Sequence, residues 1–174
     1  MAGMTPEFSR LYRLDELGGG ARAVAIEANE AERAALSVRF GLIQIDDLTV
    51  TAELVREDDA VVVTGKLRAE VVQACVASGD PVPAKIAEDF ALRFLPEAAV
   101  EAAEEIELDA NDLDVIPYEG SAVDLGEAAA QTLALALDPF PRAPDAEEKL
   151  RAAGVVGEED VGPFAALKAL RDKL

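Results

Sequence analysis

The feature that most constrains the fold is a long stretch of period-two alternation over residues 42–96. Apolar residues such as Val50, Ala52 and Leu54 alternate with polar ones, a pattern typical of strands with one buried and one solvated face. Two turn signals divide the stretch, the acidic residues 57–59 and the Ser-Gly-Asp-Pro cluster at 78–81. Together they predict several strands of an antiparallel sheet, either open or closed into a barrel.

Residues 124–144 predict a capped helix followed by a stiff exit. Asp124 and Glu127 have capping-box spacing. We therefore expect Asp124 to accept hydrogen bonds from first-turn amides, and Glu127 to reach back to the cap. Pro139 ends the helix, and with Pro141 and Pro144 it favours an extended chain. The apolar faces predicted to be buried carry Leu125, Ala128, Ala129, Leu133, Leu135 and Leu137.

Shorter elements flank these two segments. Residues 8–14, 23–28 and 113–116 show weak alternation and predict short strands. Asn29 and Glu32 have capping-box spacing before a second helix, which runs through Phe40 to a stop at Gly41. The side of that helix expected to be apolar carries Ala31, Ala34, Ala35 and Val38. The predicted fold is therefore α+β, with two helices packed on the sheet and a short C-terminal helix.

The composition excludes several classes of protein. The chain has no histidine, which removes the commonest general base and imidazole metal ligands, and its single cysteine is too few for a structural zinc site. No phosphate-binding glycine motif is present, so we expect no cofactor, no metal and no enzymatic activity. No apolar run approaches the roughly 20 residues that span a bilayer, and no signal peptide is evident. We expect a cytoplasmic protein.

The formal net charge is −19. Such a field repels phosphate backbones and favours basic partners, although it also serves solubility alone. An acidic loop at about 97–111 reads either as a solvated loop, as a docking site for a basic partner, or as a nucleic-acid mimic. We expect no DNA and no membrane partner. Candidate basic contacts are Lys66 and Arg68, which lie two apart on one strand face.

We assign residues 1–144 to one domain, and 145–174 to a linker and a short C-terminal helix. That helix begins at Gly162-Pro163 and carries the basic residues Lys168 and Arg171 in its last turns. It is too short to be stable alone. Either it docks on the core or it is a recognition element that folds on binding.

Four stretches, in order along the chain, are similar to motifs of the bacterial YceD family. They are residues 32–40 (ERAALSVRF), 71–82 (VVQACVASGDPV), 124–127 (DLGE) with 139–142 (PFPR), and 162–167 (GPFAAL). The family is named for accumulation of the large-subunit ribosomal RNA. Some members carry Cys-x-x-Cys, which has suggested metal binding. Here Ser78 stands where the second cysteine would be, so the resemblance implies no metal in this chain.

The resemblance implies a non-enzymatic role in large-subunit rRNA accumulation or ribosome assembly. The partner would be the large-subunit precursor, contacted through basic ribosomal proteins or through rRNA, and the net charge favours the proteins. Family-motif positions give the candidate binding residues Cys75, Asp124, Glu127, Pro141 and Arg142. From its surroundings in the sequence alone, Cys75 is interpreted as a small core or turn residue at the end of a strand. The alternative function is an acidic protein-interaction module unrelated to ribosomes.

Overall fold

The computed structural model describes residues 6–102 and 114–155. These fall into two compact units. We call residues 6–73, 83–102 and 114–138 the sheet unit, and residues 74–82 with 139–155 the hairpin-end unit. The end of one hairpin and the exit from the last helix of the sheet unit, far apart in sequence, thus belong to the same small unit.

The main sheet is five-stranded, in the order β2-β3-β4-β5-β6. Its strands are β2 (Arg22–Glu27), β3 (Gln44–Glu57), β4 (Ala60–Ala74), β5 (Pro81–Pro96) and β6 (Asp114–Tyr118). A second, two-stranded sheet pairs β1 (Leu11–Arg13) with β7 (Ala122–Asp124). The predicted α+β class is confirmed, and the sheet is open because β2 and β6 lie at opposite edges. One departure from the antiparallel pattern is β6, which pairs with β5 in parallel.

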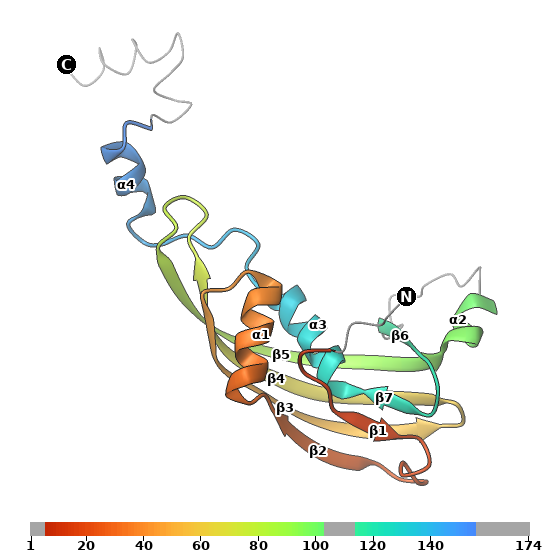
Figure 1. Cartoon of the computed structure of the whole chain (residues 1–174). Helices are drawn as coiled ribbons and strands as arrows, with labels where there is room; N and C mark the ends of the chain where they lie inside the picture. The colour runs from red at the N-terminus through yellow and green to blue at the C-terminus, as the bar shows by residue number, and fades with distance from the viewer. Residues whose placement is uncertain (1–5, 103–113, 156–174) are drawn as a thin grey trace, which may run out of the picture. The chain divides into compact units, whose positions relative to one another are not determined.

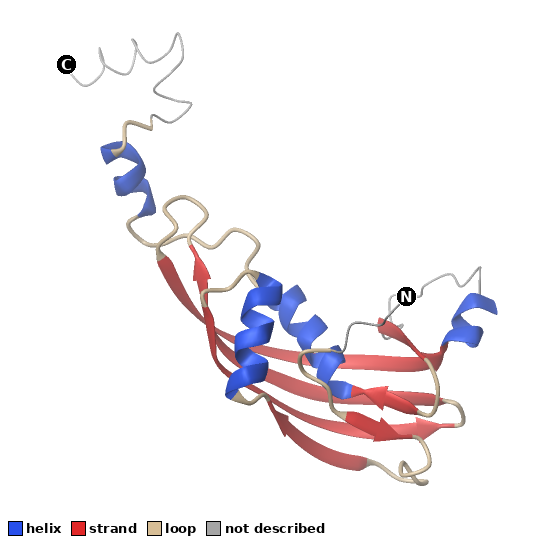
Figure 2. Cartoon of the chain, in the orientation of Figure 1, coloured by secondary structure: helices blue, strands red, loops and turns tan. Residues whose placement is uncertain are grey.

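The helices are α1 (Glu30–Phe40), α2 (Glu97–Ala102), α3 (Leu125–Ala136) and α4 (Ala146–Ala152). In the sheet unit, α1, α3 and the β1–β7 ribbon pack on one face of the main sheet (Figures 1 and 2). The acidic segment predicted as a loop begins with α2, and its remainder, like the predicted C-terminal helix, lies outside the described residues. Residues 146–152, predicted as linker, form α4.

Strand boundaries follow the local signals. The β3–β4 hairpin turns at Asp58, whose φ of +56 lies in the left-handed region that aspartate tolerates. A bulge between Ile45 and Asp47 inserts one residue into β3. It explains why Ile45 and Leu48 both face the core although they are three positions apart, a spacing that puts two residues on opposite faces of a regular strand. The bulge is visible in the sequence as a change of phase.

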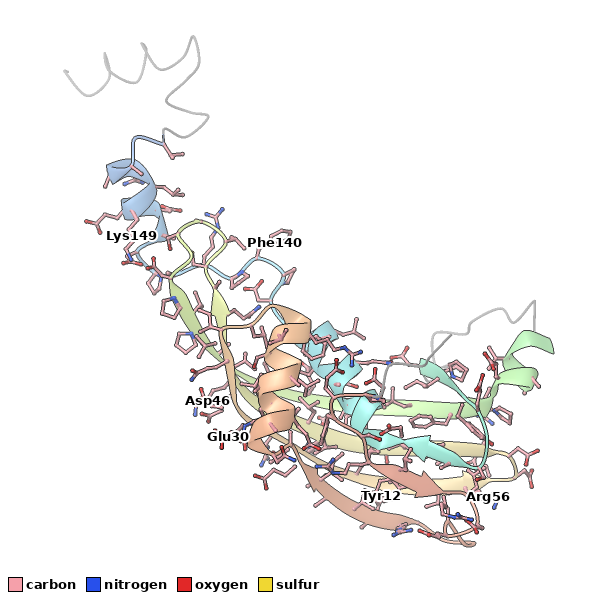
Figure 3. The ribbon with its side chains drawn as sticks, in the orientation of Figure 1. Tyr12, Glu30, Asp46, Arg56, Phe140 and Lys149 are labelled. Carbon is pink, nitrogen blue, oxygen red and sulfur yellow. The ribbon has the colours of Figure 1, made fainter. Side chains whose placement is uncertain are left out.

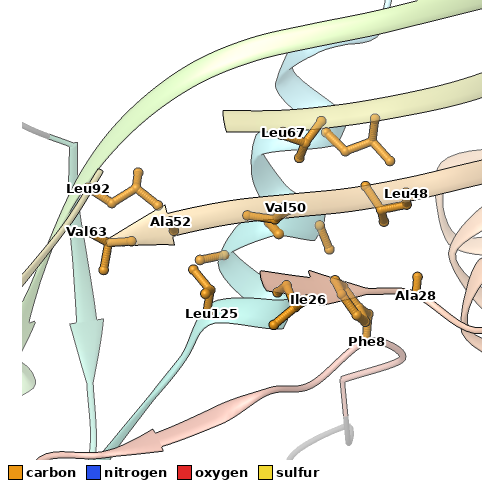
Figure 4. Close-up of a cluster of buried hydrophobic side chains, with 14 of the residues drawn as sticks. Phe8, Ile26, Ala28, Leu48, Val50, Ala52, Val63, Leu67, Leu92 and Leu125 are labelled. Atoms are coloured by element: carbon orange, nitrogen blue, oxygen red, sulfur yellow. The ribbon is translucent and has the colours of Figure 1, made fainter. Parts of the chain in front are cut away.

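The core lies between this sheet and the elements that cover it (Figure 4). Its largest fully buried side chains are Phe8, Leu36, Leu48, Leu54, Leu67, Leu125 and Leu133. Gly65 sits on the inner face of β4, where a Cβ would lie 2.8 Å from the Phe90 ring and 2.6 Å from the Thr51 carbonyl oxygen. Glycine is therefore required for the Phe90 ring to pack on the strand.

The apolar side of α1 that the sequence shows is not the side that the structure buries. The structure buries Leu36 and Ser37, while Val38 is 84% exposed. Small alanines offer little apolar area, so the larger Leu36 packs instead. The Ser37 hydroxyl donates to the Arg33 carbonyl oxygen, which allows its burial. In α3 the prediction of burial fails only in part: Leu125, Ala128, Ala129 and Leu133 are buried, but Leu135 is 85% exposed.

Candidate functional site

Cys75 opens the turn that joins β4 to β5, inside the hairpin-end unit. Its amide donates to the Asp80 carbonyl oxygen at 2.8 Å, and the Gly79 amide donates back to the Cys75 carbonyl oxygen at 2.8 Å. Gly79 has a φ of +76, which only glycine adopts without strain. These hydrogen bonds close the turn, and the Cys75 side chain is buried in the interior of the unit.

The proline-rich exit from α3 packs against this turn. The Ala143 amide donates to Cys75 Sγ at 3.3 Å, and the Val76 amide donates to the Pro141 carbonyl oxygen at 2.9 Å. The pKa of the Cys75 thiol is lowered from 9.0 to about 7. The main cause is the hydrogen bond from the Ala143 amide, and a hydrogen bond with Ser78 contributes less. Cys75 and Pro141 therefore lie in the same small network, in which backbone hydrogen bonds join the turn to the proline-rich exit.

A lysine of α4 completes the hairpin-end unit. Lys149 Nζ lies 2.8 Å from an Asp80 carboxylate oxygen and 2.9 Å from one of Asp145 (Figure 3). Lys149 lowers the pKa of the Asp80 carboxyl, and the two carboxylates raise the pKa of Lys149. Arg142 is exposed in the same unit, and no carboxylate of the described residues pairs with it.

Asp124 and Glu127 form a separate cluster in the sheet unit. Asp124 Oδ1 accepts from the amides of Gly126 at 3.0 Å and Glu127 at 3.2 Å, as the sequence predicts for an N-cap. The same carboxylate also accepts from the Ser9 hydroxyl at 2.6 Å and the Arg10 amide at 2.8 Å. With four donors, Asp124 holds the N-terminal segment against the start of α3.

Glu127 does not reach back to the cap, which corrects the expected capping box. Its carboxylate instead accepts hydrogen bonds from the two terminal guanidinium nitrogens of Arg39 on α1, each at 2.8 Å. Arg39 also donates to the Glu7 carboxylate at 2.9 Å. This bidentate pair lowers the pKa of the Glu127 carboxyl. The pair with Arg39 joins two full charges through two short bonds, whereas the capping box would give the carboxylate one bond from a neutral amide.

Lys66 and Arg68 lie on the exposed face of β4, as expected. Lys66 pairs with Asp89 of β5 at 2.9 Å, and Lys85 of β5 pairs with Glu70 of β4 at 2.6 Å. Arg68 has no carboxylate partner within the described part of the chain. The other two predicted basic contacts, Lys168 and Arg171, lie outside the described residues.

In the sheet unit, Asp124 and Glu127 are tied into structural contacts. In the hairpin-end unit the same holds for Cys75 and Pro141, whereas Arg142 stays exposed. Sequence reasoning missed Arg39, Arg10 and Lys149, which position these residues. Nothing local marks the contacts of Arg39 and Arg10, and the sequence shows only the local pair of Lys149 with Asp145, because the other carboxylates lie far along the chain.

Most basic side chains in residues 6–102 and 114–155 are neutralised by a carboxylate. The ion-paired ones are Arg10, Arg13, Arg22, Arg39, Lys66, Lys85, Arg93, Lys149 and Arg151. Arg33 and Arg56 instead donate to backbone carbonyl oxygens. The excess of carboxylates therefore dominates the charge of the surface.

These features define an acidic α+β protein in which the main sheet carries α1 and α3 on one face. The chain belongs to the YceD family: the family model described as large ribosomal RNA subunit accumulation protein YceD matches residues 63–171, more than half of the chain. Comparisons with curated proteins and with solved structures found no match. The match contains every predicted site residue, whereas Arg10 and Arg39, which hold Asp124 and Glu127, precede it.

No helix in residues 6–102 and 114–155 has the length and apolar character to cross a membrane. Within the same residues, no group of three or more Cys, Asp or Glu side chains is arranged to hold a metal ion.

Proposed function

We propose that this protein supports accumulation of the large-subunit rRNA as a non-enzymatic cytoplasmic factor that binds basic ribosomal proteins. Membership of the YceD family ties the chain to large-subunit rRNA accumulation. The mode of action, binding to basic proteins of the precursor particle, is our inference from charge. The family-motif residues Cys75, Asp124 and Glu127 would then serve mainly to build the protein that binds.

The observation that carries this proposal is the state of the cations. Recognition of rRNA needs lysines and arginines that can neutralise phosphates. Here the net charge is −19, and of the thirteen cations in the described residues nine pair with carboxylates and two more donate to backbone carbonyl oxygens. The surface therefore complements a basic protein, where opposite charge speeds encounter and excludes acidic competitors. Only Arg68 and Arg142 are left as described cations with neither a carboxylate nor a backbone acceptor.

The first test is sedimentation of a cell lysate on a sucrose gradient at low magnesium, with the fractions probed for this protein. We expect co-migration with large-subunit precursors and absence from mature ribosomes. Treating the precursor fractions with ribonuclease, then pulling down the protein, separates the two kinds of partner: retained ribosomal proteins support protein contact, whereas loss of all partners supports rRNA contact and contradicts our proposal.

The alternative, an acidic interaction module unrelated to ribosomes, predicts a different gradient. The protein would stay at the top even at low salt, because no precursor would hold it. That result would leave the family membership as a guide to the fold alone.

A further inference from the structure

A groove of about 440 Å³ runs between α3 and the strands β5 and β6. All its lining residues belong to the sheet unit. The apolar part is formed by Phe90 and Leu92 of β5, Ile116 of β6, and Ala128 and Leu135 of α3. A volume of this size is in the range of ordinary ligand pockets and takes one or two large side chains.

Leu135 gives the groove its exposed apolar wall. It is 85% exposed, although α3 otherwise buries its leucines at positions 125 and 133. A single exposed leucine needs no explanation. Leu135, however, continues an apolar surface that already includes the partly buried Phe90 and Ile116. Contiguous apolar surface of this kind marks interaction sites.

The polar part of the groove is acidic. Glu88, Asp89 and Asp114 line it, and no lysine or arginine is among the described residues that do. Asp89 pairs with Lys66, while Glu88 and Asp114 have no cationic partner in the described part of the chain. The Thr132 hydroxyl already donates to the Ala128 carbonyl oxygen, and the Gln131 side-chain amide donates to the Glu127 carboxylate. The groove therefore offers acceptors and negative charge, which disfavours phosphate groups and nucleic acid.

We propose that this groove binds a short Lys/Arg-rich segment of a basic protein, with one aliphatic side chain of that segment seated against Phe90, Ile116 and Leu135. The flanking cations of the segment would lie toward Glu88 and Asp114. This inference rests on the proposed function, since it names where the basic ribosomal protein would be held. An apolar anchor flanked by charge is a common mode of peptide recognition.

The nearest segment of this chain outside the described residues is a poor occupant. Residues 103–113 lead directly into β6 and carry five acidic residues and no basic one. Like charges at Glu88 and Asp114 would repel that segment. Charge complementarity therefore selects a basic partner.

The test uses the full chain and two fluorescein-labelled twelve-residue peptides with the same lysines. One peptide carries two leucines between the lysines, and the other carries serines there. We expect the leucine peptide to bind about tenfold more tightly than the serine peptide. Amide resonances of Ile116, Ala128 and Leu135 should shift on titration in an NMR spectrum of the isotope-labelled protein.

Two variants probe the groove, each with a matched control. Leu135→Gln should weaken binding of the leucine peptide about tenfold, whereas Val38→Gln, an equally exposed apolar position on α1, should not change it. Glu88→Gln with Asp114→Asn should weaken binding and flatten its salt dependence, whereas Glu30→Gln with Glu148→Gln should have a smaller effect. Melting curves check that each variant folds.

Several results would overturn the groove proposal: equal binding of both peptides, equal loss with Val38→Gln, or resonance shifts confined to other elements. The gradient separates this failure from that of the proposed function. If Leu135→Gln still co-migrates with precursors as the wild type does, the groove is wrong and the function stands. If the wild type does not co-migrate, the proposed function is wrong. The peptide titration then still decides whether the groove binds a basic segment.

Discussion

The sheet unit buries large aliphatic side chains such as Leu48, Leu54 and Leu67, whereas the described core of the hairpin-end unit consists of Cys75, Ala143 and Ala146. The first unit is stabilised mainly by apolar area removed from water, at about 25 cal/mol per Å². The second depends on backbone hydrogen bonds and on exposed ion pairs, which contribute less each. We therefore expect the hairpin-end unit to open locally at a lower free energy than global unfolding.

The largest expected effect comes from the sheet unit. Leu67→Ala should lower the free energy of unfolding by about 3 kcal/mol, because Leu67 is fully buried and the surrounding strands close the cavity only in part. Urea denaturation followed by circular dichroism measures this change. The counterpart Val82→Ala, in the hairpin-end unit, should cost less than about 1 kcal/mol. Equal losses in the two variants would remove the contrast between the units.

Arg39→Met tests a polar contribution within the sheet unit. It removes the bonds to Glu127 and Glu7 and should cost about 1–2 kcal/mol at pH 7. Arg39 holds the pKa of Glu127 below its ordinary 4.5. The stabilisation is thus fully present above pH 4.5 and is lost as pH falls through the lowered value. Wild type and variant should converge in acid.

Arg13→Met is the control for that measurement. Its ion pair with Asp15 is exposed, and we expect no measurable change in stability at any pH. A gap between wild type and Arg39→Met that persists undiminished at pH 3 would show that Arg39 acts through packing of its aliphatic stem.

Cys75 reports on the hairpin-end unit itself. The pKa of its thiol is lowered from 9.0 to about 7 by the Ala143 amide. The resulting stabilisation is fully present above pH 9 and is lost as pH falls through 7. Relative to Cys75→Ser, the wild type should therefore gain stability between pH 7 and 9. Thiolate absorbance should titrate near pH 7 in the native protein and near pH 9 in urea. A native midpoint near 9 would mean that the hydrogen bond from the Ala143 amide to the sulfur is not formed. The serine variant should still co-migrate with precursors.

Lys149→Met should have the smallest effect. It removes the pairs with Asp80 and Asp145, which are exposed and screened by salt. We expect amide hydrogen exchange in the hairpin-end unit to rise about two- to threefold at low salt, with no difference at 0.5 M salt and an unchanged melting temperature. Lys85→Met, in a cross-strand pair of the main sheet, is the control and should leave that exchange unchanged. A loss of global stability with Lys149→Met would show that the two units unfold together.

Local signals in the sequence predict local structure well here. The capping box of Asn29 and Glu32 is present as predicted, and Gly41 ends α1 with a φ of +64. Such features depend on neighbours three or four residues away. The face of α1 that packs is not the apolar side that the sequence shows, since the pattern shows where apolar residues lie but not which of them the sheet can reach.

The partners of the candidate site residues were beyond sequence reasoning. Glu127 binds an arginine 88 positions away, and Cys75 accepts from an amide 68 positions away. The parallel pairing of β6 with β5 is also decided by tertiary contacts, because alternation alone carries no strand direction. What the sequence supported was the family and the longer elements of the sheet unit, not α2, β7 and α4 or the contacts that assemble the elements.

The carboxylate of Asp124 has a consequence for the time course of folding. It accepts from Ser9, 115 residues earlier, so this contact of the N-terminal segment cannot form until α3 has been synthesised. At about 5–20 residues per second, the ribosome needs roughly 6–23 s to cover that distance. Until then Phe8, fully buried in the folded protein, lacks the part of its core that Leu125 supplies. Closure of this contact is therefore a late event, and earlier contacts, such as that of Arg39 with Glu7, can hold the segment before it.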